Sequence, residues 1–143
     1  MLGSGPGIGV GVASHFASQN FDKIALLSRN AERLNQDAAS VVEAAKQTKG
    51  TDSKVTVKTY SVDVSDPKSL EPVLLQVVAD LGKPEVVVYN AARVGSGKFF
   101  EANEESVNHD FKVCGVKKHL IKKYKLIYRP RFQPLGFTPL PAS

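Results

Sequence analysis

The sequence predicts an α/β fold in which helices cover both faces of a doubly wound parallel sheet. Short apolar runs alternate with longer amphipathic runs, and glycine or proline residues separate one run from the next. A glycine-rich loop also stands near the start of the chain. Strands that alternate with helices are joined by crossover connections, which place the helices on the two faces of a parallel sheet.

The first third of the chain predicts a helix, a strand and a second helix. The glycine loop, residues 3–9, leads into an expected helix over residues 7–20. The apolar run 24–27 predicts a strand buried on both faces. Asn30 is a suitable N-cap for a helix over residues 31–48, because its side chain can accept a hydrogen bond from a free N–H group of the first turn.

The next segments repeat this alternation. Residues 55–62 predict a strand, and Asp66 followed by Pro67 predicts the start of a third helix, with the carboxylate as N-cap and proline in the first turn. Gly82 is expected to end that helix. The apolar run 86–89 then predicts a further strand of the sheet.

The glycine loop predicts a phosphate-binding site. Gly3, Gly7 and Gly9 have the spacing G-x-x-x-G-x-G, which differs from the familiar G-x-G-x-x-G. Glycine lets the backbone turn tightly and approach a ligand closely. The helix that follows directs unpaired N–H groups and the positive end of its dipole at the loop. A plain tight turn is the alternative, and the order loop, helix, strand argues against it.

Length and composition are those of one globular domain. The chain has 143 residues, of which 42% are hydrophobic and 23% are charged. No apolar run reaches the roughly 18 residues of a membrane span, and no secretory signal is visible. Cys114 is the only cysteine, so an internal disulfide is excluded, and the histidines have no metal-binding spacing with it. We therefore expect a cytoplasmic protein without a metal site.

The charge divides the chain into an acidic body and a basic tail. Residues 1–111 hold 11 basic and 14 acidic side chains, whereas residues 112–143 hold 8 basic side chains and no acidic one. Four of the eight prolines lie in the last 14 residues. This abrupt change in composition predicts that the tail is not part of the α/β body.

Four short motifs resemble the amino-terminal half of the short-chain dehydrogenase/reductase family. They are the G-x-x-x-G-x-G loop, Asp63-Val64 after one strand, Asn90-Ala91-Ala92 after the next, and Asp110-Phe111. The resemblance covers residues 1–115 and implies a Rossmann-like fold, an NAD(P) cofactor and hydride transfer between carbonyl compounds and alcohols. Residues 116–143 do not resemble the family, so we expect a half-domain over residues 1–115 followed by a separate basic, proline-rich tail.

The resemblance also implies roles for cofactor-binding residues. The backbone of the glycine loop would hold the pyrophosphate, Asp63 would accept a hydrogen bond from the adenine amino group, and Asn90 would lie near the ribose. Plainer alternatives are that Asp63 ends a strand and that Asn90 forms an Asx-turn. The candidate cofactor-binding residues are Gly3, Ser4, Gly5, Gly7, Ile8, Gly9, Ser28, Arg29, Asn30, Asp63, Val64, Asn90, Ala91 and Ala92.

Arg29 indicates which dinucleotide is bound. NAD-specific folds have an acidic residue at the end of the second strand, about 20 residues after the loop, where it binds the ribose 2′-hydroxyl. This chain has Ser28-Arg29-Asn30 there, and arginine can grip a phosphate with two parallel hydrogen bonds. We therefore expect a preference for NADP(H) over NAD(H). The alternative is a solvated arginine that caps the start of the second helix.

The residues that the family needs for catalysis are missing. Its reaction uses a tyrosine with a lysine four residues later, which lowers the tyrosine pKa. None of the four tyrosines has a lysine at that spacing. Only Met1 and Leu2 precede the glycine loop, whereas a strand takes about five residues. We therefore predict a truncated fold with no catalytic residue, in which most of the first strand and the carboxyl-terminal half are absent.

Two interpretations of the chain remain open. In the first, it is a truncated product of the oxidoreductase lineage that retains at best cofactor binding, and its tail comes from a retained intron or a frame change. In the second, it is a nonenzymatic NADP(H)-binding or interaction module whose basic tail contacts nucleic acid or an anionic membrane. No aromatic-and-basic RNA motif supports nucleic-acid binding. The substrate stays unassigned, and uncovered sheet faces predict self-association.

Overall fold

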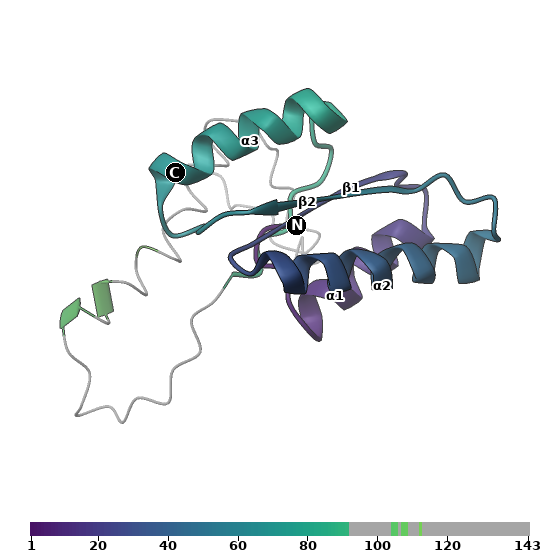
Figure 1. Ribbon diagram of the computed structural model, residues 1–143, viewed down its shortest axis with the longest axis horizontal. Helices are drawn as coiled ribbons and strands as arrows, with labels where there is room; N and C mark the ends of the chain where they lie inside the picture. The colour runs from purple at the N-terminus through teal and green to yellow at the C-terminus, as the bar shows by residue number, and fades with distance from the viewer. Residues whose placement is uncertain (92–103, 106, 109–111, 113–143) are drawn as a thin grey trace, which may run out of the picture.

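The computed structural model describes residues 1–91, 104–105, 107–108 and 112 of the 143-residue chain. Within residues 1–91, helices and strands alternate as the sequence predicts (Figure 1). The elements are α1 (Ile8–Ser18), β1 (Lys23–Ser28), α2 (Ala31–Lys49), β2 (Thr56–Ser61) and α3 (Pro67–Leu81). The α/β class of the fold is confirmed, and each observed element lies within three residues of its expected bounds.

The helix ends follow from local chemistry. The Asn30 side chain accepts a hydrogen bond of 2.8 Å from the backbone N–H of Arg33, which caps α2 as predicted. The Asp66 carboxylate accepts one of 3.0 Å from the N–H of Lys68 and caps α3 in the same way. Gly82 ends α3 with a φ of 90°, a conformation that other residues adopt only at a cost.

The sheet is parallel and is extended by a single residue beyond β1. β1 pairs with β2 from Lys23 opposite Thr56 to Ser28 opposite Ser61. On the other side of β1, Leu2 makes an isolated parallel bridge to Leu27 and another to Tyr89. Leu2 therefore occupies the place of a central strand between β1 and the segment that ends at Tyr89.

The expected strand over residues 86–89 is only partly formed. Among the described residues, its strand pairing is the bridge between Tyr89 and Leu2, in which the Leu2 N–H donates to Val88 O at 2.8 Å and the Asn90 N–H donates to Leu2 O at 2.8 Å. The physical reason is that the segment of residues 86–89 has only Met1 and Leu2 beside it on the side that faces β1. Two residues are too few for a continuous ladder, so an extended segment with one bridge takes the place of the predicted strand.

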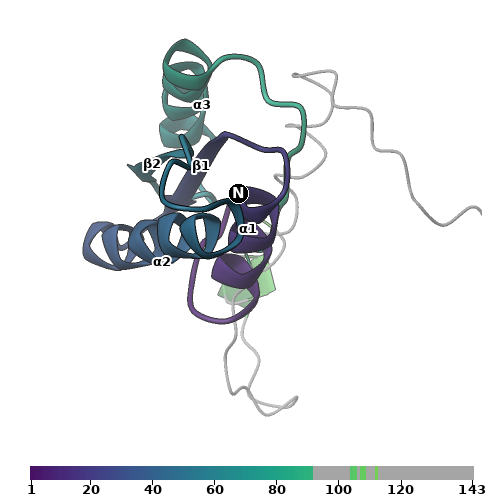
Figure 2. The same cartoon turned by 90° about the vertical axis from the view of Figure 1, so that its right-hand side faces the viewer.

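Helices cover the two faces of the sheet. Figures 1 and 2 show α3 on one face, and α1 and α2 on the other. Side chains of β1 alternate between these layers: Ile24 and Leu26 belong to the core under α1 and α2, whereas Leu27 belongs to the core under α3. Leu26 is fully buried and Leu27 is 2% exposed, so β1 is covered on both faces as the apolar run predicts.

No helix in the described part of the chain is long and apolar enough to cross a membrane.

Candidate functional site

The predicted site residues gather at one edge of the sheet, where the carboxyl ends of its strands meet. The N–H groups of Gly3 and Ser4 both donate to Leu27 O, at 2.9 and 3.1 Å. The Val62 N–H donates to Ser28 O at 2.9 Å, which joins the ends of β1 and β2. In open parallel α/β sheets, ligands bind at this carboxyl edge.

The glycine loop needs glycine at its first position. Gly3 has a φ of 80°, and a Cβ atom there would lie 2.4 Å from Ala91 N and 2.5 Å from Ala91 Cα. Gly9 is the second close approach, because a Cβ atom there would lie 3.1 Å from Gly3 O and 3.2 Å from Ser4 Cα. At Gly3 the loop therefore packs against the turn that follows Tyr89, and at Gly9 the helix α1 packs against the loop.

The start of α1 has free backbone donors. Gly7 is its N-cap, with a φ of 86° and no side chain to cap the helix. The N–H groups of Val10 and Gly11 donate to Gly5 O and Gly7 O, and within residues 1–91 no acceptor is bonded to the N–H groups of Ile8 and Gly9. Two donors at the positive end of a helix, next to an exposed loop, form a suitable environment for an anion.

Space is open above the loop. Among the described residues, a Cβ atom at Gly5 or Gly7 would meet no heavy atom within 4 Å, and the side chain of Ile8 is exposed. The loop is therefore tightly packed at Gly3 and Gly9, where it rests on the fold, and unobstructed at Gly5 and Gly7. A ligand with a phosphate group can approach the loop backbone from this open side.

The three residues at the end of β1 have different surroundings. Ser28 O is used by the sheet, and Arg29 O accepts a hydrogen bond of 2.9 Å from the Ser61 hydroxyl. The capping contact of α2 comes from Asn30, so Arg29 is not needed for it. Arg29 is exposed at the carboxyl edge of the sheet. Arg29 is thus a solvated side chain, as the alternative expects, and the helix cap itself is supplied by Asn30.

Asp63 and Val64 follow β2. Asp63 Oδ1 accepts hydrogen bonds from the N–H and the hydroxyl of Ser65, at 2.8 and 2.7 Å. This is the Asx-turn geometry that holds the loop after β2 in place. Val64 is 8% exposed and belongs to the core under α3. Its side chain anchors the loop, so only its backbone is available to a ligand.

Asn90 connects the segment after Tyr89 to the glycine loop. Its side-chain Nδ2 donates to Gly3 O at 3.3 Å, and Ala91 packs directly against Gly3. A small residue is needed at position 91 because the loop backbone lies so close. Ala92 lies outside the described residues. The structure thus brings the glycine loop, the end of β1 and the Asn90-Ala91 turn together.

A buried carboxylate that sequence reasoning missed supports the glycine loop. Asp37 of α2 is 2% exposed, and its Oδ2 accepts a hydrogen bond of 2.8 Å from the Ser4 hydroxyl. Its Oδ1 accepts one of 3.2 Å from Arg33 Nε, one helical turn earlier. The sequence feature that could have identified Asp37 is its spacing. It lies three residues after Leu34 and four before Val41, which places it on the buried stripe of α2.

The environment of Tyr60, on β2, is unfavourable for acid–base catalysis. Its hydroxyl donates to Asp80 Oδ2 at 2.8 Å. Burial, together with this hydrogen bond and the negative charge of Asp80, raises the pKa of Tyr60 well above its ordinary value of 10.0. A tyrosine acid or base needs the opposite shift, so Tyr60 is unsuited to proton transfer at neutral pH.

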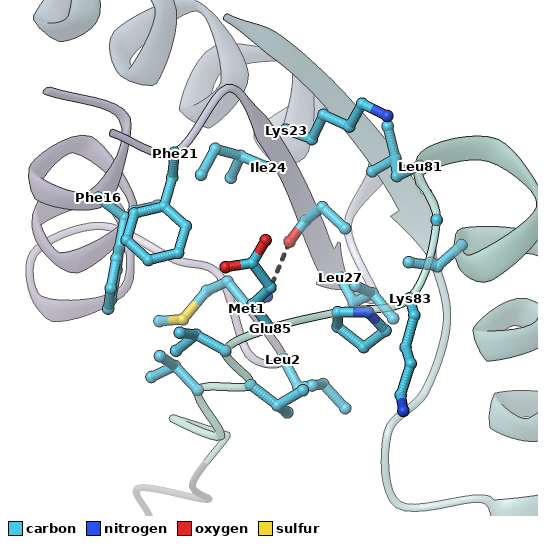
Figure 3. A pocket seen from close by; sticks show the side chains of 18 of the residues that line it. Met1, Leu2, Phe16, Phe21, Lys23, Ile24, Leu27, Leu81, Lys83 and Glu85 are labelled. Carbon is cyan, nitrogen blue, oxygen red and sulfur yellow. Dashed lines mark hydrogen bonds between the residues drawn. The ribbon is translucent and has the colours of Figure 1, made fainter. Parts of the chain in front are cut away.

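A pocket of about 420 Å³ lies at the opposite edge of the sheet. It is lined by residues from the amino end of β1, from α1 and from the segment after α3, including Lys23, Phe16 and Lys83 (Figure 3). The Met1 nitrogen donates to Ala25 O at 2.8 Å beside it. The pocket also extends along β1 to Leu27, but none of the predicted cofactor-binding residues lines it, so it is a different site from the carboxyl-edge cluster.

These features define the class of protein. Parallel strands, helices on both faces and a glycine-rich loop before α1 at the carboxyl edge make a partial Rossmann-like α/β fold. The family model of the short chain dehydrogenases matches residues 1–115. The chain belongs to the short-chain dehydrogenase family, as its four motifs predict.

Several solved structures share this fold. L-sorbose reductase from Gluconobacter frateurii, solved in complex with NADPH and L-sorbose, is 26% identical, with a TM-score of 0.71 over 85% of this chain. A Serratia marcescens short-chain dehydrogenase/reductase mutant is 20% identical (TM-score 0.68, 86% of this chain). A ketone-specific alcohol dehydrogenase from Comamonas testosteroni is 21% identical (TM-score 0.62, 86% of this chain).

The chain spans 43% of the Gluconobacter structure and 48% of each of the other two. It therefore corresponds to less than half of these solved folds. A search of the curated proteins finds no significant match.

Proposed function

We propose that this chain is a cofactor-binding part of a short-chain dehydrogenase, which holds NADP(H) at the carboxyl edge of its sheet and lacks the residues for hydride transfer. The observation that carries the proposal is the geometry of the glycine loop. Gly3 and Gly9 pack against their surroundings, Gly5 and Gly7 leave the loop open, and α1 begins beside it with free N–H groups. The residues present fit a dinucleotide pyrophosphate.

Each part of the cofactor has a candidate partner. The N–H groups of Ile8 and Gly9 would donate to the pyrophosphate oxygens. The carboxylate of Asp63, which the turn with Ser65 holds at the end of β2, would accept a hydrogen bond from the adenine amino group. The Asn90-Ala91 turn would pass beside the ribose. When bound, the nicotinamide ring would supply the hydride chemistry, and no tyrosine of this sequence has the lysine four residues later that would make it the acid or base.

The proposed preference for NADP(H) rests on Arg29. It stands where an NAD-binding protein has an acidic residue, it is exposed, and the helix cap beside it is supplied by Asn30. A free guanidinium can hold a 2′-phosphate with two hydrogen bonds. The Gluconobacter relative was solved with NADPH, which supports the same choice of cofactor.

The test is a fluorescence titration of the intact chain with NADPH and with NADH. Tighter binding of NADPH at moderate salt is the expected result, and failure of both to bind would refute the proposal. The Gly5→Phe variant places a large side chain in the open space above the loop and should abolish binding without a clash in the fold. Gly11→Ala is the matched control, because its Cβ also meets no atom within 4 Å and it lies further along α1.

Catalytic incompleteness has its own test. The chain, incubated with NADPH and a panel of ketones and aldehydes, should show no turnover, because no Tyr-x-x-x-Lys pair is present in the sequence. Steady NADPH oxidation that the Gly5→Phe variant abolishes would contradict this. The family model ends at residue 115, and the proposal places residues 116–143 outside the family sequence.

The alternative function is an interaction module that acts through its basic tail. The eight basic and no acidic side chains of residues 112–143 are the observation that favours it. Salt-sensitive binding to DNA or to anionic vesicles, lost on deletion of residues 116–143, would support this function. If binding is absent at low salt, the alternative is wrong.

We also propose a cytoplasmic location and self-association. The single cysteine is consistent with a reducing compartment. The one-residue bridge at Leu2 leaves residues 86 and 87 outside any strand pairing among the described residues, and such a backbone edge promotes association. Light scattering after gel filtration should show species larger than 15.4 kDa, and a monodisperse monomer at high concentration would refute self-association.

A further inference from the structure

Arg33 is held in place by a buried carboxylate. Its Nε donates to Asp37 Oδ1 at 3.2 Å, and its side chain is 44% exposed while that of Asp37 is 2% exposed. A guanidinium has five N–H groups, and this contact uses one of them. Within the described residues, no acceptor is bonded to the terminal amino groups of Arg33. The side chain is thus anchored at Nε and has its terminal donors available.

Short contacts place Arg33 between the glycine loop and the end of β1. The second oxygen of Asp37 accepts a hydrogen bond of 2.8 Å from Ser4, so one carboxylate joins Arg33 to the loop. The Arg33 N–H is bonded to Asn30, the residue directly after Arg29. The ribose of a bound dinucleotide lies between these same two places, with its pyrophosphate at the loop and its hydroxyls at the end of the strand.

The anchoring favours phosphate binding by arginine. A free arginine loses about 2 kcal/mol of side-chain entropy when it is ordered, and a guanidinium already fixed at one nitrogen loses less on binding. The charges in the vicinity are Arg29, Arg33, Asp37 and Glu32 in the first turn of α2. Asp37 is buried and is bound by Ser4 and Arg33, whereas the Arg33 side chain is 44% exposed.

We propose that Arg33 is a second specificity-determining residue for the 2′-phosphate of NADP(H), and that Asp37 is the positioning residue that aims it. This inference rests on the proposed NADP(H) binding and goes beyond the role of Arg29. It explains why a carboxylate is buried beside an anion-binding loop: Asp37 holds both Ser4 of the loop and the arginine that faces the ligand.

The test measures dissociation constants for NADPH and NADH in the full chain and in the variants Arg33→Gln and Asp37→Asn. For Arg33→Gln we expect NADPH to bind about tenfold more weakly, as for the loss of one charged phosphate contact, and NADH to change by less than about twofold. Asp37→Asn keeps an oxygen for the Ser4 hydroxyl and loses the charge that holds Arg33. It should weaken NADPH less than Arg33→Gln and again spare NADH.

A second measurement uses adenosine 2′,5′-bisphosphate and AMP, which differ only in the 2′-phosphate. The wild-type chain should discriminate between them, and Arg33→Gln should lose most of the discrimination. Arg33→Lys keeps the positive charge and loses the planar guanidinium that can donate two parallel hydrogen bonds, so its discrimination should be intermediate between those of the wild type and Arg33→Gln. Circular dichroism checks that each variant is folded, and any variant that fails to fold is replaced by Arg33→Lys in the comparison.

The outcomes separate the two proposals. If the wild-type chain binds neither dinucleotide, the proposed function fails and this inference fails with it. If the wild type prefers NADPH and Arg33→Gln keeps the full preference, or weakens both cofactors equally, the inference alone is overturned. Arg33 would then serve only to neutralise Asp37.

Discussion

Replacement of Gly3 by alanine should break the contact between the glycine loop and the Asn90-Ala91 turn. A Cβ atom at this position would lie 2.4 Å from Ala91 N and 2.9 Å from Ala91 Cβ, well inside contact distance. The φ of 80° is also unfavourable for any residue with a side chain. The neighbouring turn has to move, and the hydrogen bond from Asn90 Nδ2 to Gly3 O is lost with it.

The expected cost is large for a protein of this size. A left-handed conformation costs about 1–2 kcal/mol in a residue other than glycine, and overpacking of a tight site costs about 1–3 kcal/mol. The two add to about 2–5 kcal/mol, against a total stability of about 5–15 kcal/mol for a typical domain. Because the strain falls on the site, NADPH binding should be lost in the fraction of the chain that stays folded.

The assay is urea denaturation followed by circular dichroism, with NADPH titration of the folded protein. Gly5→Ala is the matched control in the same loop, because its φ is not positive and its Cβ would meet nothing within 4 Å. It should change the free energy of unfolding by no more than about 1 kcal/mol, in the stabilising direction. Equal losses of stability in Gly3→Ala and Gly5→Ala would refute the argument from close approach.

Three further predictions concern the fold around the site. Leu26→Ala should lower the free energy of unfolding by about 2–5 kcal/mol, because the Leu26 side chain of β1 is fully buried under α1 and α2. A decrease below about 1 kcal/mol in denaturant unfolding would contradict this. Asn30→Ala should cost about 1 kcal/mol through loss of the α2 cap, and Asn30→Asp, which keeps an acceptor, should restore most of it. The hydrogen bond from Tyr60 holds the pKa of Asp80 below its ordinary value of 3.8, so the stability it contributes is present above that pH and is lost as the pH falls through the folded-state pKa. The stability difference between wild type and Asp80→Asn should therefore shrink as the pH is lowered from about 5 to about 3, and a constant difference would show that the ionised carboxylate is not involved.

Much of the fold could be predicted because the signals that define it are local. Asn30 and Asp66 cap helices through hydrogen bonds to residues two or three positions away, and Gly82 ends α3 through its own backbone conformation. The candidate site could be predicted in outline for a similar reason. Residues that directly follow parallel strands meet at one edge of the sheet whatever the detailed packing.

The roles of individual residues were harder to predict. Asp63 was expected to face adenine, and its carboxylate also forms the turn with Ser65 that shapes its own loop. Asp37 was not identified as a candidate, because the role of a carboxylate on the apolar stripe of a helix cannot be inferred until its hydrogen-bond partners are known. Those partners are Ser4, 33 residues away in sequence, and Arg33, one turn earlier.

The sequence by itself determined the order of elements, the ends of the helices, the family and the position of the glycine loop, because these depend on residues close together in the chain. Only the tertiary structure decided that Leu2 stands alone between β1 and Tyr89, that the expected strand over residues 86–89 is reduced to one bridge, and that Asp37 supports the loop. The physical reason is that strand pairing and the satisfaction of a buried carboxylate depend on partners distant in sequence. Their identity appears only when the chain is folded.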